Sequence, residues 1–244
     1  MQSRNRDGAL GPIQKVFMTA IEPPIHAVMF DYDGTLVQLN IDFSRMSQEV
    51  EKLLVEYGIE PGSLKGSYAL EMIDEATKRI SKKSSPEGLA FNHKALELVT
   101  EHEVRAAKDG KKLPGVLRML TLLRERGIRV GVITRNCDKA VKMVFPDIER
   151  FSDTYLPRDY VALVKPHPGH LAMALKEMEV RDPMLCLMVG DHPMDIEGGK
   201  RMGMKTAGVL TGKITHQGFM EAEADYILED VTGIIDIIFG EEVS

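Results

Sequence analysis

Two closely spaced aspartates near the start of the chain form the strongest chemical signal in the sequence. Asp31 and Asp33 are separated by one residue, are followed by Gly34 and Thr35, and come directly after the largely apolar run 25–30. Such a run predicts a buried strand, and open α/β sheets bind their ligands beyond the carboxyl ends of their strands. Like charges this close repel each other, so the pair needs a cation, a proton or dense hydrogen bonding. The pattern therefore predicts a functional site at this strand end.

Three further strand-end loops carry polar side chains of complementary types. Thr134 and Arg135 follow one apolar run, Lys165 lies in a proline-containing loop, and Asp191 and Asp195 follow another apolar run. Each feature alone is common, but here each comes directly after an expected buried strand. Because parallel strands end at the same edge of a sheet, we expect all four loops to open on one crevice.

The residue types in these loops indicate phosphoryl chemistry. Four aspartates without a cluster of His or Cys offer hard oxygen ligands, which suit Mg²⁺ rather than zinc. A lysine and a threonine hydroxyl beside such a site suit the oxygens of a phosphoryl group. One aspartate can act as the nucleophile and form an acyl-phosphate. The aspartate two residues further on can serve as general acid and then as general base.

Helices and strands alternate along the carboxyl-terminal half of the chain. This alternation predicts an α/β fold, a Rossmann-like parallel sheet with helices on both faces. Apolar periodicity predicts helices at 116–126, 138–145, 168–178, 195–202 and 231–239, and strands at 128–133, 153–156, 184–189, 205–210 and 226–228.

The segment 41–111 interrupts this alternation. It is rich in Glu, Lys, Leu, Met and Ala and shows helical spacing without a convincing strand. Its position after the first strand predicts an inserted α-helical cap that can act as a lid over the crevice. The expected organisation is an amino-terminal extension at 1–24, a core at 25–40 and 112–244, and a cap at 41–111 with helices at 43–57, 63–82 and 86–107.

Composition excludes several classes of protein. The 244 residues are 43% hydrophobic and 28% charged, as in an ordinary globular protein. A net charge of −6 argues against a general nucleic-acid binder, and no apolar stretch is long enough to cross a membrane. Cys137 and Cys186 form no disulfide framework, which favours a reducing compartment such as the cytoplasm. The sequence leaves open whether the chain is a monomer or a homodimer.

The order of these motifs resembles that of the haloacid dehalogenase (HAD) superfamily, and in particular its phosphoglycolate-phosphatase-like group with a helical (C1-type) cap. The first family motif matches residues 31–35, the second matches Thr134 and the third matches Lys165. The fourth matches 190–191 together with Asp195. The resemblance spans about 26–238 in architecture, and its specific motifs lie in the core.

The resemblance implies a role for each aspartate. Asp31 is expected to be the nucleophile and a Mg²⁺ ligand, and Asp33 the acid/base residue, with its backbone carbonyl on the metal. Asp191 is expected to coordinate Mg²⁺. Asp195 is expected to bind the water molecules around the metal, or Lys165, without contacting the metal directly.

The same resemblance assigns the cationic and hydroxyl groups to the substrate. Thr134 and Lys165 are expected to hold the phosphoryl oxygens during catalysis. Arg135 is expected to bind substrate as well, because its neighbour Thr134 must face the phosphate.

The resulting prediction is a Mg²⁺-dependent phosphatase. It would hydrolyse a small phosphorylated metabolite, a phosphoglycolate-like compound or a sugar phosphate monoester, through an aspartyl-phosphate. One alternative is a phosphomutase that uses the same aspartate, and another is a catalytically idle binding protein on the same fold. A dehalogenase is disfavoured, because Asp33 supplies a proton-transfer group that displacement of a halide does not need.

Overall fold

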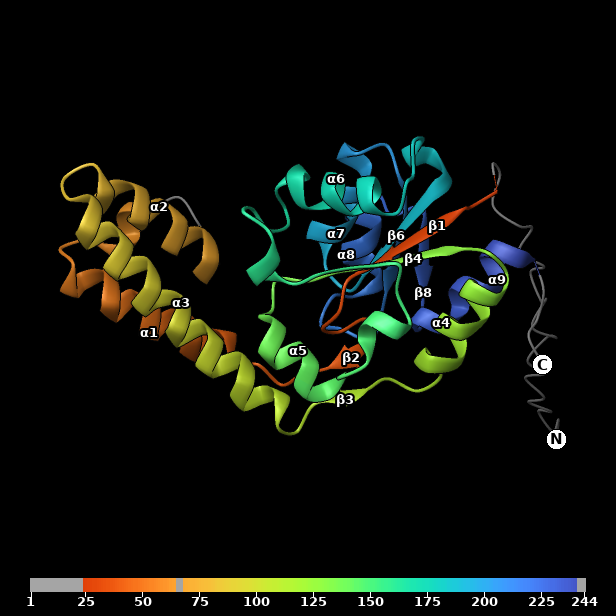
Figure 1. Cartoon of the computed structure of the whole chain (residues 1–244), viewed down its shortest axis with the longest axis horizontal. Helices are drawn as coiled ribbons and strands as arrows, with labels where there is room; N and C mark the ends of the chain where they lie inside the picture. Colours follow the sequence, from red (N-terminus) through yellow and green to blue (C-terminus); the bar gives the residue numbers. More distant parts are fainter. Residues whose placement is uncertain (1–23, 65–67, 241–244) are drawn as a thin grey trace, which may run out of the picture.

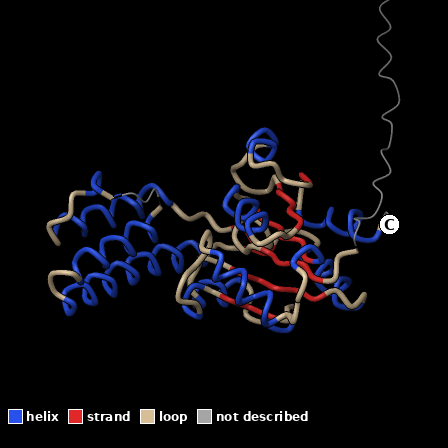
Figure 2. The backbone as a smooth tube through the Cα atoms, turned by 90° about the horizontal axis from the view of Figure 1, so that it is seen from above, coloured by secondary structure: helices blue, strands red, loops and turns tan. Residues whose placement is uncertain are grey.

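A six-stranded parallel sheet forms the centre of the molecule and confirms the predicted α/β architecture (Figures 1 and 2). The computed structural model describes residues 24–64 and 68–240, so the expected extension at 1–24 lies outside the described residues except for Pro24. The strand order is β5-β4-β1-β6-β7-β8. The strands are β1 (Ala27–Phe30), β4 (Arg129–Ile133), β5 (Thr154–Leu156), β6 (Cys186–Gly190), β7 (Lys205–Val209) and β8 (Tyr226–Leu228).

Helices cover both faces of this sheet because its strands are apolar on both sides. In β1, Val28 and Phe30 belong to one buried cluster, and Ala27 and Met29 belong to another, as the two-residue period of a strand requires. The first cluster packs against α4 (Val116–Glu125), α5 (Asp138–Val144) and α9 (Ile234–Phe239), and the second against α6 (Pro168–Glu177) (Figure 1). Two further helices are α7 (Pro193–Arg201) and α8 (His216–Glu221).

The predicted helical cap is present as three helices beside the sheet (Figure 1). They are α1 (Phe43–Glu56), α2 (Ala69–Ser81) and α3 (Ser85–Ala107). Helix α1 begins where the Asp42 carboxylate accepts a hydrogen bond from the backbone N–H of Arg45, and it buries Met46 and Val50 at helical spacing. None of the described helices has the length and apolar character needed to span a membrane.

Several elements differ from the sequence-based expectation. The predicted helix at 63–82 is a short 3₁₀ turn at Pro61–Ser63 followed by α2, and residues 65–67 between them lie outside the described residues. Strand β6 starts later than expected because Pro183–Leu185 forms another 3₁₀ turn. The sequence did not predict α8, and it missed β2 (Val37–Gln38) and β3 (Lys111–Lys112), which pair antiparallel at the base of the cap. Further 3₁₀ turns are Ile148–Arg150, Arg158–Tyr160 and Val231–Gly233.

A buried ion pair joins the cap to the core. Arg158, in the 3₁₀ turn after β5, donates from Nη2 to the carboxylate of Glu103 on α3 at 3.0 Å. Both side chains are less than a tenth exposed. Glu103 also accepts from the backbone N–H of Cys137 at 2.9 Å, and Arg158 donates to the backbone oxygen of Arg135 at 2.8 Å. The pair therefore fixes the loop after β4 as well as the carboxyl-terminal half of α3.

Replacing Glu103 with leucine tests this connection. The substitution leaves the Arg158 guanidinium buried without its partner, which destabilises proteins by about 3–5 kcal/mol. We expect a loss of that size in the free energy of unfolding, measured by urea denaturation. Lys94→Met is the control: Lys94 lies on α3 like Glu103, but its pair with Glu56 of α1 is exposed, so its loss should leave the unfolding free energy close to wild type. Equal effects of the two variants would contradict a structural role for the buried pair.

Candidate active site

The loops that carry Asp31 and Asp191 meet between neighbouring strands of the sheet. Asp31 follows β1, and its backbone N–H donates to the carbonyl of Val189 in β6 at 2.9 Å. Asp191 follows β6 directly. After β1 the next strand of the sheet, β4, lies on one side of this pair, and after β6 the next strand, β7, lies on the other side. A crevice therefore opens between the ends of β1 and β6. Both carboxylates face this crevice and line the same cavity.

A buried lysine connects two of the carboxylates. The ammonium of Lys165 lies 2.6 Å from Oδ1 of Asp31 and 2.7 Å from Oδ1 of Asp195, and the lysine is only 2% exposed. Carboxylate oxygens of Asp31, Asp191 and Asp195 all lie within 4.8 Å of one another. The structure thus brings together the lysine and three of the aspartates that the sequence singled out.

Burial and mutual repulsion strongly perturb these groups. Burial, followed by the charges of Asp31, Asp195 and Asp33, raises the pKa of Asp191 to about 9. Burial also raises the pKa of Asp195 to about 6, although Lys165 opposes this shift. Burial disfavours the charged form of Lys165, but Asp195 and Asp31 outweigh that effect and raise its pKa. A cation is therefore the natural complement of this cluster, because it would favour the ionised carboxylates.

The donor set fits Mg²⁺. Asp31 and Asp191 supply hard oxygen ligands, and two glycines let the backbone approach Asp191 closely. A Cβ atom at Gly34 would lie 2.2 Å from Oδ2 of Asp191, and one at Gly212 would lie 2.1 Å from it. Asp195 already binds Lys165 through Oδ1 and accepts from the backbone N–H of His192 through Oδ2 at 3.3 Å. These contacts favour a supporting position for Asp195.

Asp33 occupies a different part of the crevice from the carboxylate cluster. Between the two aspartates, Tyr32 turns inward and its hydroxyl donates to the backbone oxygen of Val141 at 3.0 Å, which fixes the loop. Asp33 lines the cavity, and its Oδ1 accepts from the backbone N–H of Leu39 at 2.8 Å. Burial, and to a smaller extent the charge of Asp31, raises the pKa of Asp33 to about 7. A carboxyl group in this range can both give and take a proton near neutral pH.

The loop after β4 brings Thr134 and Arg135 to the cavity. Thr134 is 1% exposed, and its Oγ1 accepts from the backbone N–H of Asn136 at 3.1 Å, so its hydroxyl proton is available to a ligand. The guanidinium of Arg135 makes two parallel hydrogen bonds, of 2.7 and 2.8 Å, to the carboxylate of Glu71 on α2. It also donates to the backbone oxygen of Lys165 at 2.6 Å. Arg135 therefore lies where the sequence predicted, with a carboxylate of the cap as its partner.

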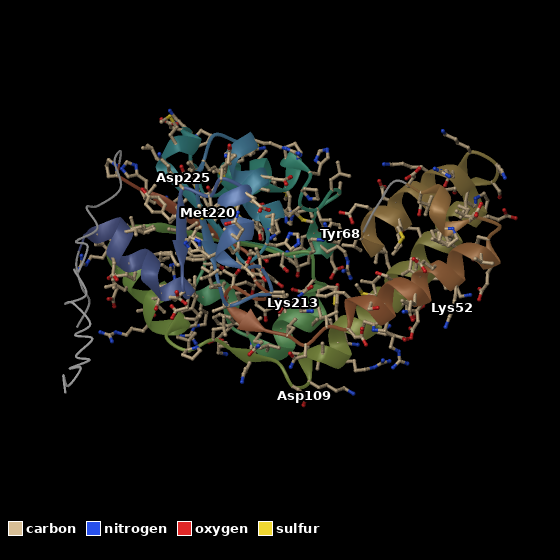
Figure 3. The ribbon with its side chains drawn as sticks, turned by 180° about the vertical axis from the view of Figure 1, so that it is seen from behind. Lys52, Tyr68, Asp109, Lys213, Met220 and Asp225 are labelled. Carbon is tan, nitrogen blue, oxygen red and sulfur yellow. The ribbon has the colours of Figure 1, made fainter. Side chains whose placement is uncertain are left out.

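The cavity between the cap and the core has a volume of about 680 Å³. Its lining includes residues that the sequence analysis missed, namely Tyr68 on the cap and the loop 211–214 after β7. Figure 3 shows Tyr68 at the junction of cap and core, and Lys213 on the side of the core that faces the cap. Loop 211–214 follows the predicted strand at 205–210, so the strand-end rule could have found it. Nothing in the sequence marks Tyr68 or Glu71.

Three histidines near the site accept hydrogen bonds from backbone N–H groups of the loops and helix starts. The side chain of His192 accepts from the backbone N–H of Met194 at the start of α7, and that of His167 caps α6 in the same way. His170 is fully buried, accepts from the backbone N–H of Lys165 at 3.1 Å and lies 3.0 Å from the backbone oxygen of Leu156. These bonds require the neutral imidazole, and burial lowers the pKa of His170 to about 4.

The lowered pKa of His170 predicts a pH-dependent loss of stability. The unfolded chain binds more protons than the folded one between its ordinary pKa of 6.5 and about 4, so stability falls as the pH falls through that window. His170→Gln should reduce the pH-dependent change in unfolding free energy between pH 6.5 and 4 by an amount on the order of 3 kcal/mol. Urea denaturation at several pH values measures it. His93→Gln, at an exposed position of α3, should retain the wild-type dependence; identical curves for H170Q and wild type would refute the assignment.

Gly212 offers a test of the carboxylate cluster in which no charged residue is substituted. Gly212→Ala adds a methyl group where Oδ2 of Asp191 lies, so the carboxylate must move. We expect Mg²⁺ affinity, measured by calorimetry, to fall by about 10- to 100-fold, as when groups that orient metal ligands are lost. Gly62→Ala, with no atom within 4 Å of the new Cβ, is the control. Unchanged affinity in G212A would place the metal away from Asp191.

An acidic crevice at the point where strand order reverses, beside helices inserted after the first strand, defines a doubly wound α/β protein with an inserted cap. The chain belongs to the haloacid dehalogenase-like hydrolase family, whose model matches residues 28–209. This membership confirms the resemblance inferred from the motifs.

Individual relatives refine this placement. Pyrophosphatase PpaX of Bacillus velezensis is 31% identical over 229 residues, which cover 87% of this chain and 96% of that protein. A crystal structure of a predicted phosphoglycolate phosphatase from Haemophilus somnus is similar with a TM-score of 0.59 at 20% identity, covering 87% of this chain and 97% of that one. A putative β-phosphoglucomutase from Thermotoga maritima has a TM-score of 0.53 at 18% identity, with coverage of 88% and 98%. At these identities the two structures establish the fold alone.

Proposed function

We propose that this hydrolase is a Mg²⁺-dependent phosphatase that acts on a small phosphorylated metabolite through an aspartyl-phosphate. The observation that carries the proposal is the ion cluster at the strand ends, where Lys165 contacts Asp31 and the carboxylate of Asp191 lies beside them. Membership of the family supports the same reading. The sequence-based assignments of Asp33, Thr134 and Asp195 are part of this proposal.

In the first half-reaction, an oxygen of the Asp31 carboxylate attacks phosphorus, and the bond from phosphorus to the leaving oxygen breaks. Asp33 gives its proton to that oxygen, so the alcohol leaves neutral. Lys165 and the hydroxyl of Thr134 hold the phosphoryl oxygens, on which negative charge is concentrated. Mg²⁺, when bound by Asp31 and Asp191, supplies further positive charge to those oxygens.

In the second half-reaction, Asp33 is ionised and accepts a proton from an attacking water. The oxygen of that water bonds to phosphorus, the bond between phosphorus and Asp31 breaks, and inorganic phosphate leaves. Asp33 is protonated again and Asp31 is a free carboxylate, which restores the starting state. The pKa of Asp33, near 7, suits a group that must be acid in one step and base in the next.

The relative named as a pyrophosphatase supports a second candidate substrate. Hydrolysis of pyrophosphate would use the same two half-reactions with phosphate as the leaving group, so the site residues do not separate an ester from an anhydride. Measuring the release of phosphate from a phosphate ester and from pyrophosphate distinguishes these two substrates. A phosphomutase would also use Asp31 but would return the phosphoryl group to an organic product without releasing phosphate.

Substitution of the three aspartates tests the proposed roles. We expect Asp31→Asn to abolish release of phosphate from an aryl phosphate in the presence of Mg²⁺, because an amide oxygen is a poor nucleophile. Asp33→Asn should slow turnover by about 100- to 10,000-fold, the usual range for general acid–base catalysis, with Mg²⁺ affinity close to wild type. Asp191→Asn should lose Mg²⁺ affinity and activity together.

Two results would contradict the proposal. Turnover by D31N equal to wild type would exclude Asp31 as the nucleophile. Absence of turnover by the wild-type protein, with every phosphate ester and anhydride tested and Mg²⁺ present, would favour the catalytically idle alternative. Circular dichroism of each variant serves as the control for folding.

A further inference from the structure

Two of the three basic groups around the cavity are already paired with carboxylates. Three basic side chains line it among the described residues: Arg135, Lys165 and Lys213. Lys165 binds two carboxylates at 2.6 and 2.7 Å, and Arg135 binds Glu71 through both of its terminal nitrogens. Six carboxylate side chains line the same cavity, twice the number of basic ones. A substrate with a second negative charge would enter a field that is already acidic.

Lys213 is the third basic group of the cavity. Its ammonium lies 5.7 Å from the centre of the Phe43 ring and interacts with the charge of Asp33. It therefore lies between the acid/base residue and the first helix of the cap.

The cap supplies an apolar wall of the cavity. Met46, Leu70 and Val99 line the cavity, one from each of α1, α2 and α3. Met46 and Val99 are buried, so this wall is continuous with the cap's own core. Such a surface stabilises an apolar part of a ligand by removing it from water, and it offers nothing to a second phosphate.

One uncharged donor in the cavity lining is left without a partner among the described residues. Asn136 is 7% exposed and lines the cavity, and its side-chain Nδ2 is buried with no hydrogen-bond partner among the described residues. Its backbone is fixed on both sides, by Thr134 Oγ1 and by the backbone N–H of Arg158. Buried amides are rarely left unpaired. Because this nitrogen is shielded from solvent, a ligand oxygen would satisfy it only if the side chain turned toward the cavity.

We propose that Glu71 determines the charge class of the substrate: by neutralising Arg135 it selects a phosphate monoester of an uncharged, partly apolar alcohol over phosphoglycolate and pyrophosphate. The Glu71 carboxylate takes the position on the guanidinium that a substrate carboxylate or second phosphate would take. This inference rests on the proposed phosphatase function and specifies its substrate.

The test compares substrates that differ in one charge. Release of phosphate is measured with the full chain and Mg²⁺ for phosphoglycolate, for its carboxamide and for pyrophosphate. The wild type should favour the carboxamide over phosphoglycolate by at least about tenfold in kcat/KM, and pyrophosphate should be the poorest substrate. Glu71→Gln, which keeps the size of the side chain, should shift both ratios toward the charged substrates by about tenfold or more, mainly through KM.

Asp74→Asn is the matched control. Asp74 lies on α2 with Glu71 and pairs with Lys78 on its exposed side, so the substitution changes net charge equally without affecting the cavity. Its substrate ratios should equal those of wild type. Calorimetry gives a second readout: methylenediphosphonate should bind E71Q more tightly than wild type, whereas methylphosphonate should bind both equally.

The outcomes separate this inference from the proposed function. Wild-type preference for phosphoglycolate or pyrophosphate would overturn the inference and leave the phosphatase standing. Equal changes of all three substrates in E71Q would also overturn it, because they would show that Glu71 only holds the cap against the core. Failure to release phosphate from any compound would overturn the phosphatase itself. If E71Q does not fold, a wild-type preference for phosphoglycolate over its carboxamide still overturns the inference.

Discussion

The ammonium of Lys165 lies between the carboxylates of Asp31 and Asp195, and this buried contact makes the acidic edge of the sheet compatible with a folded chain. Loss of one partner from a buried ion pair destabilises proteins by several kcal/mol, so the three groups depend on one another. The lysine is held in turn through its own backbone, since its N–H binds His170 and its carbonyl binds Arg135. The segments after β1, β4, β5 and β6 thus meet at a single residue, through its ammonium and its backbone.

The sequence predicted the parts of this site that follow from local rules. Apolar runs located the core strands, and polar residues directly after them located Asp31, Thr134 and Asp191, because parallel strands end at one edge. The cap was predicted because a long helical segment interrupted the alternation of strands and helices. These inferences need only neighbouring residues and the geometry of a parallel sheet, which is why they agree with the structure in element type and order.

Contacts between distant segments could not be predicted in this way. Glu71 and Arg135 are separated by 64 positions, and Glu103 and Arg158 by 55, with no local pattern linking either pair. Each pair depends on how the cap lies on the core, which is a property of the folded whole. The sequence therefore identified the residues proposed for catalysis more completely than the cap residues that would contact the leaving group of a substrate.

The short antiparallel ribbon formed by β2 and β3 has a consequence for how such enzymes change over time. It places the beginning and the end of the inserted helices side by side, with Val37 opposite Lys112 and Gln38 opposite Lys111. An insert whose two ends are adjacent can lengthen, shorten or be exchanged without moving the strands on which it is mounted. The residues at the strand ends of the core and the residues of the cap that line the cavity can thus evolve at different rates within one polypeptide.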